Sequence, residues 1–97
     1  MQYFENIPEI ALQVIENEID SIKHLKSSVD ENFSKAIHLI LESKGNLVFS
    51  GIGKSALIAQ KIVATMNSTG TPSVFMHAVD AIHGDLGIVR DEDIVII

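Results

Sequence analysis

The chain has 97 residues, of which 46% are hydrophobic, with a formal net charge of −6 and no cysteine. This length and apolar content fit one domain with a core and exclude wholesale disorder. The acidic balance argues against a general nucleic-acid surface, and the lack of cysteine excludes disulfides, thiolate zinc sites and cysteine nucleophiles. The sequence shows no signal-peptide pattern and no apolar run of about 18 residues, so we expect a cytoplasmic protein without a membrane span.

Two amphipathic helices are predicted in the first 45 residues. In the stretch 10–25 apolar residues recur at helical spacing, which favours packing against another helix of this chain or of a partner. These apolar residues are Leu12, Ile15, Ile19 and Ile22. A second helix is predicted over 29–44, and Gly45 is expected to end it in the left-handed conformation. Its expected buried face consists of Val29, Phe33, Ala36, Ile37, Ile40 and Leu41. We interpret His24 and His38 in these helices as structural.

The remaining residues predict alternating strands and helices. Strands are expected over 46–50, 72–76 and 91–97, and a short helical segment is expected before the third strand. A helix is expected over 54–69, ended by Gly70, with an apolar spacing formed by Leu57, Ile58, Ile62 and Met66. This order implies parallel strands joined by right-handed crossovers. The predicted fold class is therefore α/β, a layered parallel sheet preceded by a helical arm.

The third predicted strand is unusually apolar. It ends in "IVII", and such a run needs a covering layer on both of its faces. We therefore expect residues 1–45 to form an N-terminal helical arm and residues 46–97 to form the first half of a larger domain. Alone, this chain is expected to need partner chains to cover its sheet.

The stretch "SGIGKS" between the first strand and the next helix is the most informative motif. A nucleotide-triphosphatase loop would need a glycine where Val48 stands, so that class fails on spacing. Gly51, Gly53 and Ala56 formally match a dinucleotide fingerprint, but the acid expected at the end of the second strand is absent.

Generic chemistry gives a further interpretation of this turn. Glycines allow a tight turn close to a ligand, and the first amides of a helix attract anions. Lys54 adds a positive charge that is unfavourable at a helix start unless an anion binds there. Ser50, Gly51, Gly53 and Lys54 are therefore candidate phosphate-binding residues, and a plain turn with a solvated lysine is the alternative.

A second polar cluster follows the second strand. It consists of His77, Asp80, His83 and Asp85. Since ligands of parallel sheets bind at the carboxyl ends of the strands, this cluster and the glycine turn should share one edge. His77 and His83 are candidate metal ligands without an assigned third partner, and His83 is equally a candidate general acid or base.

The sequence from Asn46 to Ile97 resembles the start of the sugar isomerase (SIS) domain. The turn "GIGKS", the joint "STGTP" and the segment "HGDLG" occur together in the order and spacing of that family. Within that family the sequence looks like the D-arabinose-5-phosphate isomerases. This implies a three-layer αβα, flavodoxin- or Rossmann-like fold and interconversion of D-ribulose 5-phosphate and D-arabinose 5-phosphate, on the route to the lipopolysaccharide sugar Kdo.

The resemblance also implies residue roles. Lys54 matches the active-site lysine of the family, Gly70 and Thr71 match substrate-contacting positions, His77 matches a zinc ligand, and His83 matches a substrate-contacting histidine. Two departures concern the stretch Ala78 to Asp80, where the family usually has Pro-Gly-Glu, and Ala56, where it usually has glycine. The family's serine-rich phosphate loop and its remaining catalytic acids and histidine follow the third strand and would lie beyond residue 97.

The resemblance therefore predicts an aldose–ketose isomerase acting through an enediolate. In it, Lys54 would steady the developing charge and His83 would open the ring or transfer a proton. No nicotinamide, flavin or nucleotide cofactor is expected, and a zinc ion at His77 would inhibit rather than assist. The expected partners are a sugar phosphate and further copies of the chain, as a tetramer by family resemblance. The alternatives are a phosphosugar sensor without turnover and a purely oligomerising segment.

Overall fold

The computed structural model of the chain describes residues 6–97, without the side chains of Asp85 and Leu86. The chain divides into two compact units, with the boundary between Ile37 and His38. This boundary lies inside a helix. The division into an arm of residues 1–45 and a domain half of residues 46–97 stays a prediction.

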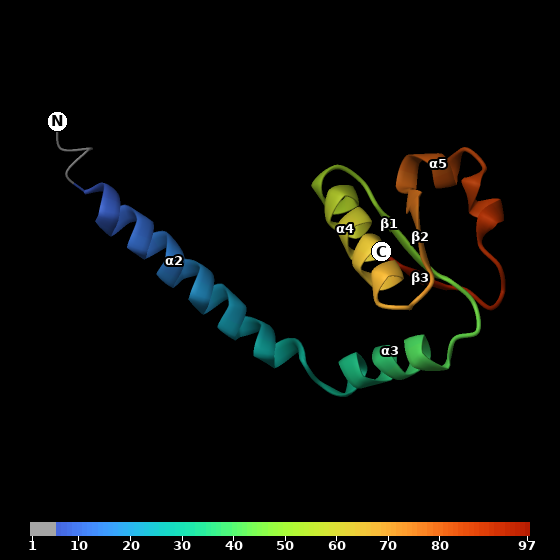
Figure 1. The fold of residues 1–97 in the computed structure, drawn as a ribbon, viewed down its shortest axis with the longest axis horizontal. Coiled ribbons are helices and arrows are strands. Elements are labelled where there is room, and N and C mark those ends of the chain that lie inside the picture. Colours follow the sequence, from blue (N-terminus) through green and yellow to red (C-terminus); the bar gives the residue numbers. More distant parts are fainter. Residues whose placement is uncertain (1–5) are drawn as a thin grey trace. The chain divides into compact units, whose positions relative to one another are not determined.

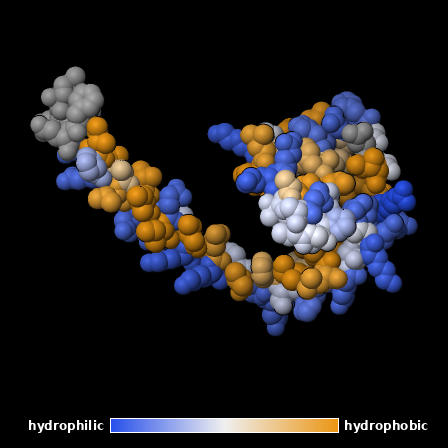
Figure 2. Space-filling model, viewed as in Figure 1, coloured by the Kyte–Doolittle hydropathy of each residue, from blue (hydrophilic) through white to orange (hydrophobic). Residues whose placement is uncertain are grey.

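The first unit is dominated by one long helix, α2 (Ile7–His24), followed by the 3₁₀ turn η1 (Leu25–Ser28). The helix begins three residues earlier than we predicted, because Pro8 occupies its first turn, where a missing N–H costs nothing. The expected apolar face is present but exposed, and Figure 2 shows it as a hydrophobic run along α2. No described residue of the helix is buried.

Helix α3 (Glu31–Glu42) is shorter than predicted. Asp30 precedes it, and its Oδ1 accepts a hydrogen bond of 3.0 Å from the Phe33 N–H, a side-chain cap that starts the helix. The expected buried face was largely wrong for this chain, since Phe33, Ile37 and Leu41 are 49%, 38% and 75% exposed. Ile40 is the exception among the described members, because it is partly buried against the core of the second unit. Helical spacing reports an apolar face, but it does not report which chain covers that face.

The second unit is built on a parallel sheet in the order β2-β1-β3, drawn in Figure 1. The strands are β1 (Leu47–Gly51), β2 (Ser73–His77) and β3 (Ile94–Ile96). The central strand pairs Leu47 with both Ser73 and Ile94. Its first three residues are buried, as a strand with neighbours on both sides requires. The predicted α/β class with a parallel sheet is confirmed.

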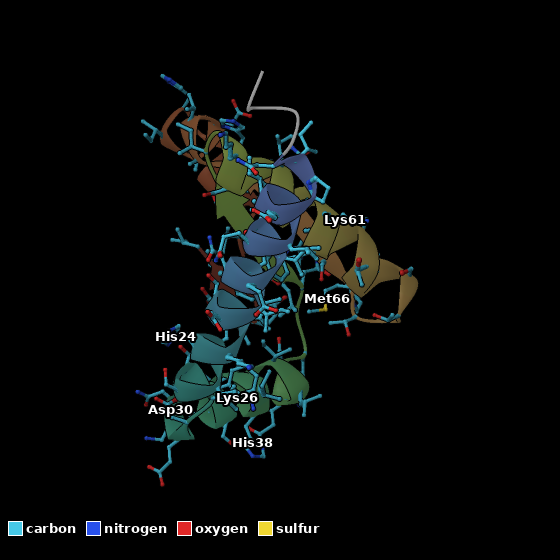
Figure 3. All side chains as sticks on the ribbon, turned by 90° about the vertical axis from the view of Figure 1, so that its left-hand side faces the viewer. His24, Lys26, Asp30, His38, Lys61 and Met66 are labelled. Carbon is cyan, nitrogen blue, oxygen red and sulfur yellow. The ribbon has the colours of Figure 1, made fainter. Side chains whose placement is uncertain are left out.

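Helix α4 (Lys54–Ser68) packs on one face of this sheet. The core cluster is Leu47, Phe49 and Ala59, against which the partly buried Val63 and Met66 of the helix pack (Met66 is labelled in Figure 3). The apolar spacing correctly predicted this helix, but it did not indicate which side of α4 faces the sheet. Three of the four residues in that spacing are exposed: Leu57, Ile58 and Ile62. The small side chains of Ala56 and Ala59 face the sheet instead, because they allow a close helix–sheet approach.

Gly45 does not end α3 in the left-handed conformation as expected. The described glycines with a positive φ are Gly53, Gly70 and Gly84. At Gly45 a Cβ would lie 2.5 Å from the Asp93 Oδ1 and 2.5 Å from the Glu92 carbonyl oxygen. The glycine is therefore needed because the segment leading into β3 passes against the backbone that leads into β1.

Asp93 holds these two segments together. Its Oδ2 accepts a hydrogen bond of 2.8 Å from the Arg90 N–H, and its Oδ1 accepts one of 2.8 Å from the Asn46 N–H. Because these bonds favour the charged carboxylate, they hold the pKa of Asp93 below its ordinary value. The carboxylate thereby fixes the start of β3 beside the start of β1.

The other described elements are α5 (Ala78–Ile82) and the 3₁₀ turn η2 (Asp85–Ile88), which fill the connection between β2 and β3. They confirm the short helical segment predicted there. Among residues 6–97, no helix combines the length and apolar character that a membrane crossing needs.

The two hydrogen bonds that the Asp93 carboxylate accepts, here called the Asp93 clamp, should stabilise the complete gene product that contains residues 1–97. This stabilisation should be lost at acidic pH. Asp93→Asn should lower the unfolding temperature by a few degrees at neutral pH, because the amide oxygen can accept only one of the two bonds. In the wild type this contribution is present above the unfolded-state carboxyl pKa of about 3.9 and is lost as pH falls through the lower folded-state pKa. Thermal unfolding followed from neutral to acidic pH measures both effects.

The control for this prediction is Asp91→Asn, which removes a nearby exposed carboxylate. It should leave the unfolding temperature near that of the wild type. If Asp93→Asn behaves like Asp91→Asn at every pH, the clamp does not stabilise the fold.

Candidate functional site

The turn between β1 and α4 contains two glycines that are required for different reasons. A Cβ on Gly51 would lie 3.1 Å from the Ala56 backbone nitrogen, so this glycine permits the first turn of α4 to pack on the end of β1. Gly53 has open space around it but a φ of 61°, which favours glycine. Together these two glycines allow α4 to begin directly against the end of the central strand.

The start of α4 has the features of an anion-binding turn. No described side chain caps the helix, and the Ala56 N–H bonds to the Gly53 carbonyl oxygen at 3.1 Å. Lys54 is the first helical residue, is exposed, and stands where the helix dipole is already positive. A phosphate or a developing oxyanion would relieve this concentration of positive charge.

The predicted second cluster lies at the same end of the sheet as the turn before α4, where β1 and β2 have their carboxyl ends. Gly51 is the register partner of His77, and Ser50 is the partner of Met76, so β1 and β2 end side by side. In Figure 1 the turn before α4 and helix α5 both lie at the upper end of the sheet. The prediction that the glycine turn and the residues after β2 share one edge is therefore confirmed by the register.

Within this second cluster, α5 sets the positions of the polar residues. The His77 Nδ1 accepts a hydrogen bond of 3.2 Å from the Val79 N–H and so caps the helix. His83 is the C-cap residue, and its N–H donates to the Asp80 carbonyl oxygen at 3.1 Å. The side chains of Asp80 and His83 are exposed. The side chain of Asp85, the fourth predicted member, lies outside the described part of the chain.

Gly70 and Thr71 lie just before β2, at the opposite end of the strands from Lys54. They form the turn between α4 and β2, where Gly70 has a φ of 94° and the Thr71 N–H donates to the Met66 carbonyl oxygen at 2.8 Å. The 15 residues of α4 span about 20 Å at roughly 1.5 Å per residue, so this turn is far from Lys54 within one chain. The structure does not bring the two predicted groups together.

Asn67 is a positioning residue that the sequence analysis missed. Its Nδ2 donates to the Ser73 carbonyl oxygen at 3.0 Å, and its Oδ1 accepts from the Ser73 N–H at 2.8 Å. The side chain thus substitutes for a neighbouring strand at the start of β2. Periodicity does not reveal such a residue, because its partner is a backbone group beyond the next turn.

The described residues do not fit the zinc site expected at His77. In the part of the chain that the structure describes, no three histidine, cysteine, aspartate or glutamate side chains are grouped closely enough to hold a metal ion. The Nδ1 of His77 is already occupied by the Val79 N–H. We therefore assign no chemical step to a metal.

An open hollow of about 360 Å³ lies beside the start of β3, at the opposite end of the strands from Lys54. Its lining residues are Leu39, Glu42, Ser43, Lys44, Asp91, Glu92, Asp93 and Ile94. Four of these residues are acidic and one is basic, so the hollow does not suit a phosphate. His24 and His38, labelled in Figure 3 on α2 and α3, are exposed.

Comparison with known proteins agrees with the resemblance in the sequence. The family profile described as the SIS domain matches residues 39–97. A probable arabinose 5-phosphate isomerase of Haemophilus influenzae is 45% identical over 92 residues, 95% of this chain and 27% of the relative. The arabinose 5-phosphate isomerase KdsD of Francisella tularensis is 43% identical over 89 residues, 89% of this chain and 27% of the relative.

The structural comparison points to the same family. A protein of E. coli CFT073 solved in complex with arabinose 5-phosphate superposes with a TM-score of 0.84 and 37% identity, covering 94% of this chain and 48% of that chain. The chain thus spans about a quarter of the length of these curated relatives and about half of the solved one. The family match covers more than half of the chain. The chain belongs to the SIS domain family.

Proposed function

We propose that the protein containing these residues is a sugar-phosphate isomerase that interconverts D-ribulose 5-phosphate and D-arabinose 5-phosphate. The observation that carries this proposal is the likeness to the E. coli CFT073 protein in complex with arabinose 5-phosphate, combined with one sheet edge that holds both Lys54 and the residues after β2. The names of the two bacterial relatives support the same substrate class. The protein would supply D-arabinose 5-phosphate for Kdo and lipopolysaccharide precursor synthesis.

The turn before α4 suits the charge that this reaction develops. In the aldose-to-ketose direction a base removes the proton from C2, and the electron pair moves onto O1 to form an enediolate. A proton is then delivered to C1, O1 gains a proton to become the C1 hydroxyl, and O2 gives up its proton as it becomes the ketone oxygen. Lys54, fixed at the start of a helix, stabilises the negative oxygens with little reorganisation.

The remaining roles at this edge fall to backbone amides and to His83. Gly51, Gly53 and the first amides of α4 approach the bound substrate, with Ser50 at the end of β1 beside them. His83 opens the sugar ring or carries the proton between carbons, since an imidazole can give and take protons near neutral pH. The departure at Ala78 to Asp80 leaves a shorter carboxylate where the family usually has a glutamate, and Asp80 is exposed.

The first prediction is direct turnover. The complete gene product should convert D-arabinose 5-phosphate to D-ribulose 5-phosphate without added metal or nucleotide cofactor, because the proposed chemistry needs only proton transfer and charge stabilisation. A coupled or chromatographic assay for the ketose measures this. Saturable binding of D-arabinose 5-phosphate without conversion would instead support a phosphosugar sensor.

The second prediction concerns Lys54. Lys54→Ala should lower kcat by roughly a hundredfold, the scale for losing one preorganised electrostatic group. The free energy of unfolding should hardly change, because an exposed cation at a helix start contributes little to stability. Steady-state kinetics with D-arabinose 5-phosphate and thermal unfolding measure both effects.

Lys61→Ala is the matched control, because Lys61 is an exposed lysine later in the same helix (Figure 3). It should leave kcat and KM near the wild-type values. A raised KM with unchanged kcat in Lys54→Ala would restrict Lys54 to phosphate binding. No change in either constant would remove Lys54 from the site.

We also propose that the protein is a homo-oligomer, a tetramer by family resemblance, in which the apolar face of α2 contacts a second copy. Leu12, Ile15 and Ile22 are 62%, 54% and 63% exposed on one side of this helix. Their spacing of 3 to 4 residues, continued by Ile19, fits a helix–helix seam. Large apolar side chains at such spacing favour burial against another helix.

This interface predicts an effect of charge on assembly. Ile19→Asp should shift the complete gene product toward smaller species, because it places a carboxylate in the apolar seam. Asn17→Asp adds the same charge on the opposite side of α2 and should leave the assembly intact. Light scattering coupled to size-exclusion chromatography measures the masses, and equal masses for both variants would exclude α2 from the interface.

A further inference from the structure

His77 links the sheet to helix α5. It is the last residue of β2 and the N-cap of α5, with an extended backbone (φ −63°, ψ 132°) that leaves the strand and enters the helix. Its Nδ1 accepts the 3.2 Å hydrogen bond from the Val79 N–H. Its ring stands edge-on to Phe75, with centroids 6.1 Å apart and an interplanar angle of 90°. Two separate contacts therefore orient this imidazole.

The hydrogen bond to Val79 determines where the ring carries its proton. A nitrogen that accepts from an N–H has no proton of its own, so a neutral His77 carries its proton on Nε2. Zinc bound at Nε2 would require the proton to move to Nδ1, where it would face the Val79 N–H. Zinc bound at Nδ1 would displace the Val79 N–H. Either form of metal binding conflicts with the cap.

Helix α5 is short and begins at the His77 cap. It contains five residues, too few for a helix to form independently, and its first turn has a side-chain acceptor in His77. It is followed directly by His83 and then by Gly84, whose φ is 121°. The orientation of the backbone that carries His83 therefore depends strongly on how α5 leaves β2.

We propose that His77 is a positioning residue whose Nδ1 caps α5 and thereby holds His83 at the edge of the sheet that carries Lys54. It acts through this hydrogen bond and not as a metal ligand. The consequence for catalysis rests on the isomerase function proposed above, whereas the cap and the proton position can be measured without any activity.

Two amide substitutions separate the two ring nitrogens. An asparagine places an oxygen close to the position of Nδ1 and is among the preferred N-cap residues, whereas the longer glutamine places its oxygen closer to the position of Nε2. His77→Asn should keep KM and kcat within about threefold of the wild type, a smaller change than the loss of a typical capping hydrogen bond would cause. His77→Gln and His77→Ala should lower kcat/KM by about fivefold or more, the ratio that corresponds to such a bond.

The same variants have a readout that does not depend on turnover. Hydrogen exchange at the Val79 amide should stay slow in His77→Asn and become faster in His77→Gln and His77→Ala. Slow exchange and full activity in His77→Gln, together with loss of both in His77→Asn, would overturn the proposal and assign the role to Nε2. Wild-type exchange in all three variants would also overturn it.

The wild-type protein tests the proposal without any substitution. Long-range ¹H–¹⁵N correlation spectra at about pH 8 should show an unprotonated Nδ1 and a protonated Nε2 for His77, and addition of zinc chloride should leave these signals in place. A protonated Nδ1, or zinc-dependent shifts of the His77 nitrogens, would overturn the cap. An inactive wild-type protein with the expected spectrum would contradict the isomerase function alone.

Discussion

The described domain depends on the close approach of α4 to the end of β1. Gly51 has no side chain at the point where an added Cβ would meet the Ala56 nitrogen at 3.1 Å, and Ala56 is itself buried. The helix can therefore start directly over the central strand, with Ala59 continuing the contact into the core. A larger residue at Gly51 would push the helix start away from the sheet and displace Lys54 with it. Fold and candidate chemistry thus share one steric requirement.

The parallel register of β1 and β2 fixes the position of the polar residues that follow β2 relative to the turn before α4. Because Gly51 pairs with His77, any shift of β2 along β1 would separate α5 from the turn before α4. The opposite ends of the strands are held by other means: Asn67 fixes the start of β2, and Asp93 fixes the start of β3. One end of the sheet is therefore clamped by side-chain hydrogen bonds to the backbone, while the other end presents a lysine, free helix amides and two histidines.

The sequence predicted what depends on local pattern and failed where packing between segments decides. The glycine turn, the buried central strand and the shared edge follow from spacing and from the geometry of parallel sheets. The side of α4 that faces the sheet did not follow, because the helical spacing was read from residues such as Leu57 and Ile58, which are exposed, whereas the small Ala56 and Ala59 are buried. Gly45 was misread because the segment that excludes a Cβ there is almost fifty residues away. The role of the His77 ring depends on a backbone amide two residues later, which residue type alone does not specify.

The proposed function requires that the turn before α4 and the residues after β2 form one sugar-phosphate site. Amide NMR spectra of the complete gene product, recorded during titration with D-arabinose 5-phosphate, test this claim directly. A single site predicts saturable shifts of the Gly53, Lys54 and Ser55 amides together with those of α5 and His83, at one common dissociation constant. Saturable binding that leaves the amides from Gly53 to Ser55 unmoved would contradict it.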